Sequence, residues 1–170
     1  MPEKKKTKAK AEERITEEIK ETPKQPPYKV LFLASECVPF VKTGGLADVI
    51  GALPKELKRQ GVDVRVMIPL YSAIDPKYRE QMTRICEFYV QLGWRSQYCG
   101  ILTMEYQGVP VYFIDNEYYF GRGYIYGQSN SDEGERFAFF SKAALEAMPR
   151  IGFYPDVLHA HDWQAAMSIA

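Results

Sequence analysis

The spacing of apolar residues changes several times along the chain, and each change predicts a different element. Val30–Ala34 is a nearly continuous apolar run, typical of a parallel strand buried on both faces. Between Leu46 and Leu57 apolar residues recur every three or four positions, which predicts an amphipathic helix that Gly61 ends. Val62–Pro69 is rich in β-branched residues and predicts a second strand. A strand–helix–strand unit of this length predicts a right-handed crossover with parallel pairing. The apolar face of its helix is expected to contain Leu46, Val49, Ile50, Leu53 and Leu57.

The middle of the chain predicts shorter strands and a hairpin. Asp75–Arg84 is expected to form a short helix or a loop, and Gln107-Gly108 is typical of a tight turn between two strands. Tyr118–Asn130 alternates tyrosine with glycine, which predicts an irregular surface loop. Its aromatic rings could stack on sugars or pack beneath the loop, and both interpretations stay open. The three strands are predicted at Ile85–Val90, Cys99–Tyr106 and Val109–Asp115.

The last third of the chain predicts a helix followed by a buried strand. Ser131–Arg136 offers cap candidates and early acidic residues, as at a helix start, and the helix is expected to end near Pro149. Asp156–Asp162 predicts a buried strand with a polar end, and another helix begins at Trp163. The alternation of elements predicts an α/β fold, with a Rossmann-like, mostly parallel sheet and helices on both faces. The buried face of the longer helix is expected to contain Phe137, Phe140, Ala144, Leu145 and Met148.

Residues 1–27 differ from the rest in composition. They are rich in lysine and glutamate, contain only two aliphatic side chains larger than alanine apart from Met1, and end in a proline-rich stretch. Such a segment cannot build a core, and we expect a flexible charged extension, with a partner-binding arm as the alternative. Its glutamates and its lack of serine argue against a transit peptide. Residues 28–170 are expected to form the folded domain.

Charge and cysteine content narrow the possible partners. The 22 basic and 22 acidic residues give zero net charge, which provides no overall electrostatic footprint for nucleic acid or an anionic membrane. No apolar stretch approaches the roughly 20 residues needed to span a bilayer. Cys37, Cys86 and Cys99 lack the spacing of a zinc site or redox pair, so reduced, buried thiols are expected. These features favour a cytoplasmic protein with a small or neutral ligand.

The segment Lys42–Val49 carries the strongest chemical signal. Gly44 and Gly45 have no Cβ and can adopt positive φ, so a ligand can approach the backbone. The next helix adds unpaired N–H donors and the positive end of its dipole, and Lys42 adds a full charge. Ligands of such sheets bind beyond the carboxyl ends of the strands, where this corner falls. The pattern predicts a site for a phosphate or a carboxylate.

Spacing alone does not decide the role of this corner. It matches neither the GxGxxG turn nor the GxxxxGK[ST] phosphate loop, because the lysine precedes a single Gly-Gly pair. An ordinary strand-to-helix turn with a solvated lysine explains the spacing about as well.

A second polar group follows the last predicted strand. His159, His161 and Asp162 are residue types that bind metals, but no third or fourth ligand is evident, and we expect neither a metal nor another cofactor. An acid–base pair is conceivable, although no nucleophile elbow accompanies it. The alternative is a His–Asp pair that caps the helix beginning at Trp163.

The segment Lys42–Val49, together with the preceding Ser35–Phe40, resembles the N-terminal signature of bacterial glycogen synthases and plant starch synthases. His159–Trp163 matches the same family, and the resemblance extends from about Val30 to Ala170. It implies a GT-B glycosyltransferase that transfers glucose from ADP-glucose to the non-reducing end of an α-1,4-glucan with retention of configuration. Members carry a second, C-terminal domain beyond the part seen here. The 170 residues are therefore expected to be an incomplete N-terminal domain, inactive alone.

The resemblance also implies roles for individual residues. Tyr126 is the close alternative to Tyr124 as an aromatic contact for the sugar nucleotide. Asp162, with His161, is implied as catalytic. The residues implied to bind ADP-glucose are Lys42, Gly44, Gly45, Asp48 and Tyr124. Two other functions stay open: a non-catalytic nucleotide- or glucan-binding half-domain, and a GT-B transferase that uses another nucleotide sugar.

Overall fold

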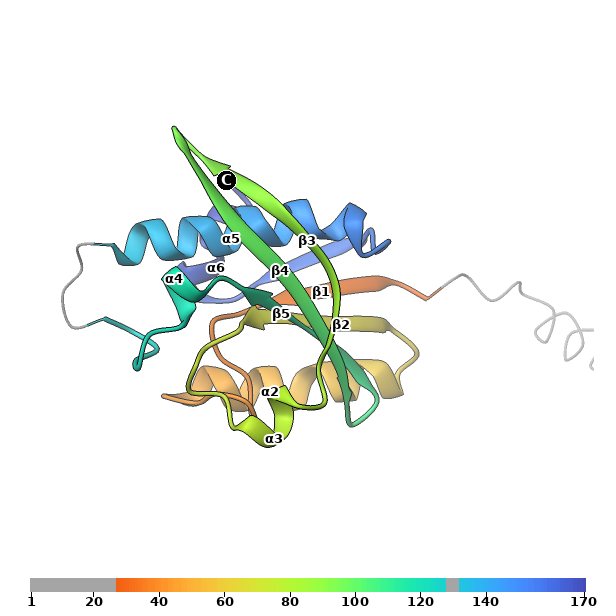
Figure 1. Ribbon diagram of the computed structural model, residues 1–170. Helices are drawn as coiled ribbons and strands as arrows, with labels where there is room; N and C mark the ends of the chain where they lie inside the picture. Colours follow the sequence, from red (N-terminus) through yellow and green to blue (C-terminus); the bar gives the residue numbers. More distant parts are fainter. Residues whose placement is uncertain (1–26, 128–131) are drawn as a thin grey trace, which may run out of the picture.

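Figure 1 shows the computed structural model of the protein, which describes residues 27–127 and 132–170. The predicted charged extension therefore lies outside the described residues, except for its last position. Within them, six strands form a single sheet in the order β3-β4-β5-β2-β1-β6. The strands are β1 (Lys29–Leu33), β2 (Asp63–Pro69), β3 (Thr83–Leu92), β4 (Arg95–Tyr106), β5 (Val109–Asp115) and β6 (Val157–Ala160).

The sheet is mixed, with a parallel half and an antiparallel half. β1 pairs in parallel with β2 on one side and with β6 on the other, and β2 pairs in parallel with β5. β3, β4 and β5 are antiparallel neighbours. At the β4–β5 turn Gln107 and Gly108 have φ of 50° and 80°, as a two-residue hairpin turn requires. The predicted parallel opening unit and this hairpin are both confirmed.

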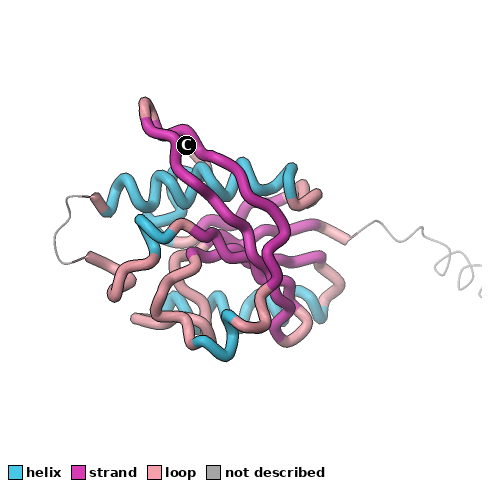
Figure 2. Tube along the Cα trace, viewed as in Figure 1, coloured by secondary structure: helices cyan, strands magenta, loops and turns pink. Residues whose placement is uncertain are grey.

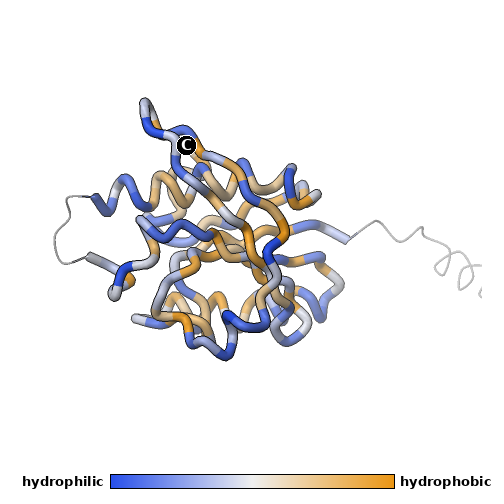
Figure 3. Tube along the Cα trace, viewed as in Figure 1, coloured by the Kyte–Doolittle hydropathy of each residue, from blue (hydrophilic) through white to orange (hydrophobic). Residues whose placement is uncertain are grey.

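Helices cover both faces of the sheet, as predicted. In Figure 1, α2 (Gly45–Arg59) and α3 (Pro76–Arg79) lie on one side, and α5 (Glu133–Arg150) and α6 (Asp162–Ala165) lie on the other. Figure 3 shows hydrophobic residues gathered where the sheet and helices meet. Pro149 lies in the last turn of α5, so this helix ends where the sequence predicts.

Two helix faces differ in detail from the predicted ones. On α2, Val49 is 46% exposed, and the buried side is formed by Ala47, Ile50, Gly51 and Pro54. Small residues are favoured there because the helix lies close to the loop after β1: a Cβ at Gly51 would lie 2.2 Å from Cγ2 of Val38.

On α5, Leu145 is exposed at its surface, whereas Phe139 and Ala143 are fully buried. The helix contacts β3, β5 and α6, so its buried face is wider than one apolar stripe.

The β3–β4 hairpin is longer than predicted. It extends from the rest of the fold in Figure 2, and Trp94 at its turn is 87% exposed. Gln91, Gly93 and the polar residues 95–97 interrupt the apolar pattern of this stretch, so the sequence does not predict the extension. Main-chain pairing between β3 and β4 nevertheless continues to the Leu92–Arg95 pair.

The prediction of an irregular loop over Tyr118–Asn130 is partly wrong. Its first residues belong to α4 (Glu117–Phe120), which Asn116 caps by accepting a hydrogen bond from the Tyr119 amide at 2.9 Å. Tyr119 and Phe120 are fully buried, and the rings of Tyr119 and Phe139 lie 4.9 Å apart. Burial of these rings against α5 stabilises the short helix α4, which the glycine-rich composition of the segment did not predict. Residues 128–131 lie outside the described part of the chain.

The cysteines lie inside the fold. Cys37 and Cys99 are buried and Cys86 is partly buried, all as free thiols. Burial raises the pKa of Cys37 to about 12, although Lys55 opposes this change. In the described part of the chain no helix is both long and apolar enough to cross a membrane.

Candidate functional site

Two polar segments that are far apart in the sequence meet at the carboxyl edge of the parallel strands. Ser35 and Glu36 follow β1, and His161 follows β6, the strand beside it. The His161 amide donates a hydrogen bond of 2.9 Å to the Leu33 carbonyl, which fixes the two strand ends against each other. The predicted glycine corner, Lys42–Gly45, closes this edge at the start of α2.

Glu36 is the centre of the hydrogen bonding at this corner. Its Oε2 accepts from the backbone amides of Thr43 and Gly44, the latter at 3.2 Å. Its Oε1 accepts from the Thr43 hydroxyl at 2.7 Å and from the Tyr126 hydroxyl at 2.6 Å. Sequence reasoning did not assign this residue a role. An acidic side chain between an apolar strand and a glycine turn is the signal that could have found it.

The local contacts keep Glu36 ionised. Burial acts to raise the pKa of Glu36, but hydrogen bonds from Tyr126, Thr43 and Gly44 outweigh it, and the pKa is lowered overall. Burial and the bond to Glu36 raise the pKa of Tyr126 well above its usual range. Tyr126 therefore stays protonated and donates a hydrogen bond to Glu36, while its oxygen lies 2.7 Å from the Ser35 hydroxyl oxygen. A neutral tyrosine thus holds an anionic carboxylate against the corner.

Lys42 and Asp48 form an ion pair at the mouth of the corner. Nζ of Lys42 lies 2.7 Å from both carboxylate oxygens of Asp48. The two side chains are 51% and 57% exposed. An ion pair this exposed contributes only about 0–1 kcal/mol, so a bound anion could take over the lysine at low cost.

Gly44 and Gly45 leave space in front of the helix. Gly44 is the N-cap residue with an extended φ of −149°, and neither glycine adopts the left-handed conformation that sequence reasoning considered. A Cβ built on either one meets nothing within 4 Å. The first-turn amides of α2 at Gly45 and Leu46 have no intrahelical acceptor. The glycines therefore serve neither backbone conformation nor packing among the described residues, and the open space can admit a ligand.

The second predicted pair shows unusual geometry. Asp162 has φ of +60°, which is uncommon for a residue other than glycine, although aspartate tolerates it better than most, and residues in such conformations cluster at functional sites. The His161 ring stacks on Phe32 at 5.2 Å and lies 4.2 Å from His159. Burial lowers the pKa of His161, as does His159, while Asp162 opposes the change. The N-cap residue of α6 (Asp162–Ala165) is His161, and its side chain makes no capping hydrogen bond in the described part of the chain, so the helix-capping interpretation is wrong.

The two candidate tyrosines have different environments. Tyr126 contacts Glu36, as described above, and so belongs to the glycine corner. Tyr124 is 45% exposed, and its hydroxyl accepts a hydrogen bond of 3.2 Å from Arg122. Of the two alternatives, Tyr126 is the one joined to the other candidate residues.

A cavity of about 530 Å³ is lined in part by Tyr126. Trp163, which is 55% exposed, provides an aromatic wall next to Asp162. Of the residues predicted to bind or catalyse, only Tyr126 belongs to the described lining of this cavity; Asp162 precedes the lining residue Trp163 in the sequence, and the Lys42–Asp48 corner lies apart from it. Across residues 27–127 and 132–170, no cluster of three or more potential metal ligands occurs. The described lining of the cavity consists of Tyr126, Gly127, Glu133, Gly134, Trp163 and Gln164.

Comparison with known families gives this geometry a context. The family model for the starch synthase catalytic domain matches residues 29–170. The chain belongs to the starch synthase catalytic domain family. The family resemblance seen in the sequence is thereby confirmed.

Relatives within the starch synthase catalytic domain family include bacterial glycogen synthases. That of Anoxybacillus flavithermus is 58% identical over 139 residues, which cover 82% of this chain and 28% of the relative. That of Desulforamulus reducens is 59% identical, with the same coverage. The chain thus spans less than a third of the length of these relatives.

A solved starch synthase structure confirms the fold class. The catalytic domain of starch synthase IV from Arabidopsis thaliana, bound to ADP and acarbose, matches with a TM-score of 0.74 and 31% identity. The match covers 85% of this chain and 29% of that one. The predicted α/β architecture of a GT-B catalytic domain is therefore correct.

Proposed function

We propose that the chain is part of a retaining glycosyltransferase that transfers glucose from ADP-glucose to the non-reducing end of an α-1,4-glucan. Membership of the starch synthase family and the glycogen synthase relatives support this proposal. The observation that carries it is the glycine corner, where Lys42, first-turn amides and open space gather at the carboxyl edge of the sheet. In the related starch synthase IV, ADP and acarbose are the bound molecules.

The corner suits the diphosphate of ADP-glucose. Glu36 engages the amides of Thr43 and Gly44, which leaves the amides of Gly45 and Leu46, the helix dipole and Lys42 for the ligand. As the bond to glucose breaks, negative charge develops on the leaving diphosphate, and fixed donors stabilise it most at that point. Lys42 would exchange its exposed pairing with Asp48 for a phosphate oxygen.

The cavity beside Tyr126 suits a sugar. Trp163 offers an aromatic face, and Glu133 and Gln164 offer polar groups for hydroxyls. We propose that Asp162 stabilises the positive charge that develops on the transferred glucose, and that His161, kept neutral by burial, hydrogen-bonds to the sugar. The strained backbone of Asp162 supports its assignment.

The proposed reaction needs more than this domain. We propose that residues 28–170 form an N-terminal Rossmann-like domain of a cytoplasmic enzyme. A C-terminal domain, within the remaining length that the relatives possess, would supply the other contacts to the nucleotide. The 170 residues alone are then expected to show no transfer.

Substitution of Lys42 tests the proposed function. In the full-length protein, Lys42→Ala should lower kcat/KM for ADP-glucose about tenfold, because one ammonium contact to the diphosphate is lost. Lys142→Ala, the same change at an exposed position of α5, is the control and should leave kcat/KM unchanged. Equal kinetics for Lys42→Ala and the wild type would contradict the assignment. Assays with UDP-glucose and GDP-mannose distinguish the other GT-B alternatives.

A further inference from the structure

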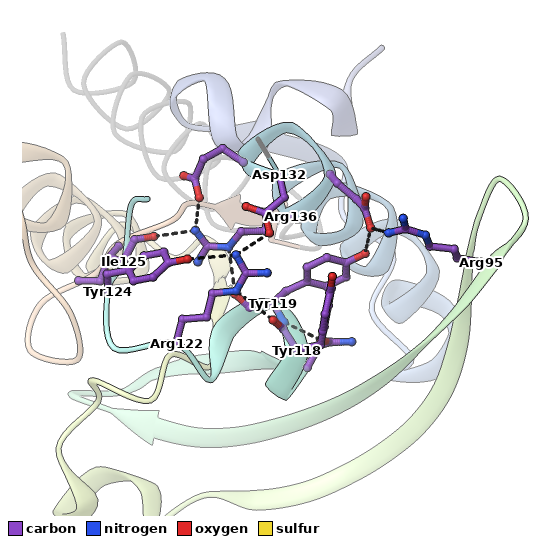
Figure 4. A network of polar contacts seen from close by, with 11 residues as sticks. Arg95, Tyr118, Tyr119, Arg122, Tyr124, Ile125, Asp132 and Arg136 are labelled. Atoms are coloured by element: carbon purple, nitrogen blue, oxygen red, sulfur yellow. Dashed lines mark hydrogen bonds and ion pairs between the residues drawn. The ribbon is translucent and has the colours of Figure 1, made fainter. Parts of the chain in front are cut away.

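Arg136 is a fully buried arginine that ties together segments around the candidate site. It lies in the first turns of α5, with its whole side chain out of contact with solvent. Its Nε donates to the Tyr119 carbonyl at 2.9 Å, and its Nη1 donates to the Ile125 carbonyl at 3.3 Å (Figure 4). Nη1 also pairs with Glu133. Arginine is almost never buried this completely unless its charge is paired.

These contacts define the path of one stretch of chain. The carbonyls of Tyr119 and Ile125 lie at the two ends of the segment that leads from α4 toward Tyr126. Because a single planar guanidinium holds both, the distance between the ends of the segment is fixed. Arg122 ties the segment from a more exposed side, through the Tyr118 carbonyl at 3.0 Å and the Tyr124 hydroxyl at 3.2 Å.

Tyr126 follows Ile125 directly and carries this constraint to the glycine corner. Its hydroxyl donates to Glu36, which in turn accepts from the Thr43 and Gly44 amides. Stability alone explains a buried Arg–Glu pair poorly, since apolar replacements of such pairs are often neutral or stabilising. The pair between Arg136 and Glu133 is better explained by the geometry that it imposes.

We propose that Arg136 is a positioning residue, which holds Tyr126 against Glu36 and thereby sets the shape of the glycine corner. Its role in turnover rests on the proposed function, whereas its role in positioning does not. Lysine cannot replace it, because one ammonium lacks the planar fork that reaches both carbonyls.

A double-mutant cycle in the full-length protein tests the effect on turnover. Arg136→Lys and Tyr126→Phe should each lower kcat/KM for ADP-glucose about tenfold, and the double variant should fall no more than about twofold below Tyr126→Phe. Losses that multiply would show that Arg136 does not act through Tyr126, and would overturn the proposal. Arg150→Lys, at the other end of α5, is the control and should change kcat/KM in neither background.

Hydrogen exchange tests the positioning without reference to activity. Arg136→Lys should speed exchange of the Thr43 and Gly44 amides at least about fivefold, while amides in β2 keep their wild-type rates. Unchanged exchange at the corner, or equal acceleration everywhere, would overturn the proposal. If Arg136→Lys does not fold, Arg136→Gln is measured instead, since its amide can reach one carbonyl. A wild type that transfers no glucose would refute the proposed function, and this exchange result would still decide the positioning.

Discussion

Glu36→Ala is expected to lower kcat/KM for ADP-glucose about a hundredfold, because the donors of the corner are no longer held in place, and loss of a single donor to developing negative charge costs an active site about 10²–10³ in kcat. Removal of the carboxylate leaves the Thr43 and Gly44 amides and the Tyr126 hydroxyl without their acceptor. Unmet donors of this kind should also lower the free energy of unfolding by about 2–3 kcal/mol. Steady-state kinetics and urea unfolding of the full-length protein measure the two effects.

Two control variants sharpen this test. Glu36→Gln should lose much less than Glu36→Ala, because its carbonyl oxygen can still accept from the amides, while the hydroxyls of Thr43 and Tyr126 can rotate to accept from its NH₂ group. Glu80→Ala removes the same charge from an exposed position and should change neither quantity. Wild-type activity in Glu36→Ala would show that the corner does not depend on this carboxylate.

Gly45→Val is expected to raise KM for ADP-glucose about a hundredfold while leaving stability unchanged within about 0.5 kcal/mol, since valine has a slightly higher helix propensity than glycine. A Cβ at Gly45 meets nothing within 4 Å, so the added side chain enters the open space proposed for the diphosphate. Gly45→Ala, with a smaller side chain, should give an intermediate increase. Initial-rate kinetics and thermal unfolding separate the two effects.

Gly51→Ala is the matched control on the same helix. Its Cβ would lie 2.2 Å from Cγ2 of Val38, so this variant should lose about 1–3 kcal/mol of stability through overpacking. We therefore expect Gly45 to be needed for ligand binding and Gly51 to be needed for the stability of the fold. Normal kinetics in Gly45→Val would mean that no ligand occupies the space in front of the helix.

Strong periodicity made much of the fold predictable. The apolar run at Val30–Ala34 indicates burial on both faces and the β-branched run at Val62–Pro69 indicates a strand, and both form central parallel strands. The spacing of apolar residues between Leu46 and Leu57 correctly predicted α2. It did not predict which side of the helix is buried, because Ala47 and Gly51 pack closely although their side chains are too small to stand out as hydrophobic.

The missed features depend on contacts between distant residues. The extension of the β3–β4 hairpin is held by main-chain pairing, which does not require a regular apolar pattern in Gln91–Tyr98. Burial of Tyr119 and Phe120 depends on a surface that α5 supplies. In each case the structure of the segment depends on the residues that it pairs with or packs against, and its own sequence does not show them.

The candidate site was predictable only in part. Lys42, Gly44 and Gly45 could be proposed as ligand-binding residues because their chemistry and order are local, whereas Asp48 was implied by the family resemblance. Glu36 was missed since its role depends on Tyr126, which is 90 residues away in the sequence.

A crystal structure of the full-length protein with ADP bound tests most directly whether the glycine corner holds the diphosphate. We expect diphosphate oxygens at hydrogen-bond distance, about 3 Å, from Nζ of Lys42 and from the Gly45 or Leu46 amide, with Lys42 no longer paired with Asp48. A diphosphate bound elsewhere, with the Lys42–Asp48 pair intact and the corner open, would contradict this expectation.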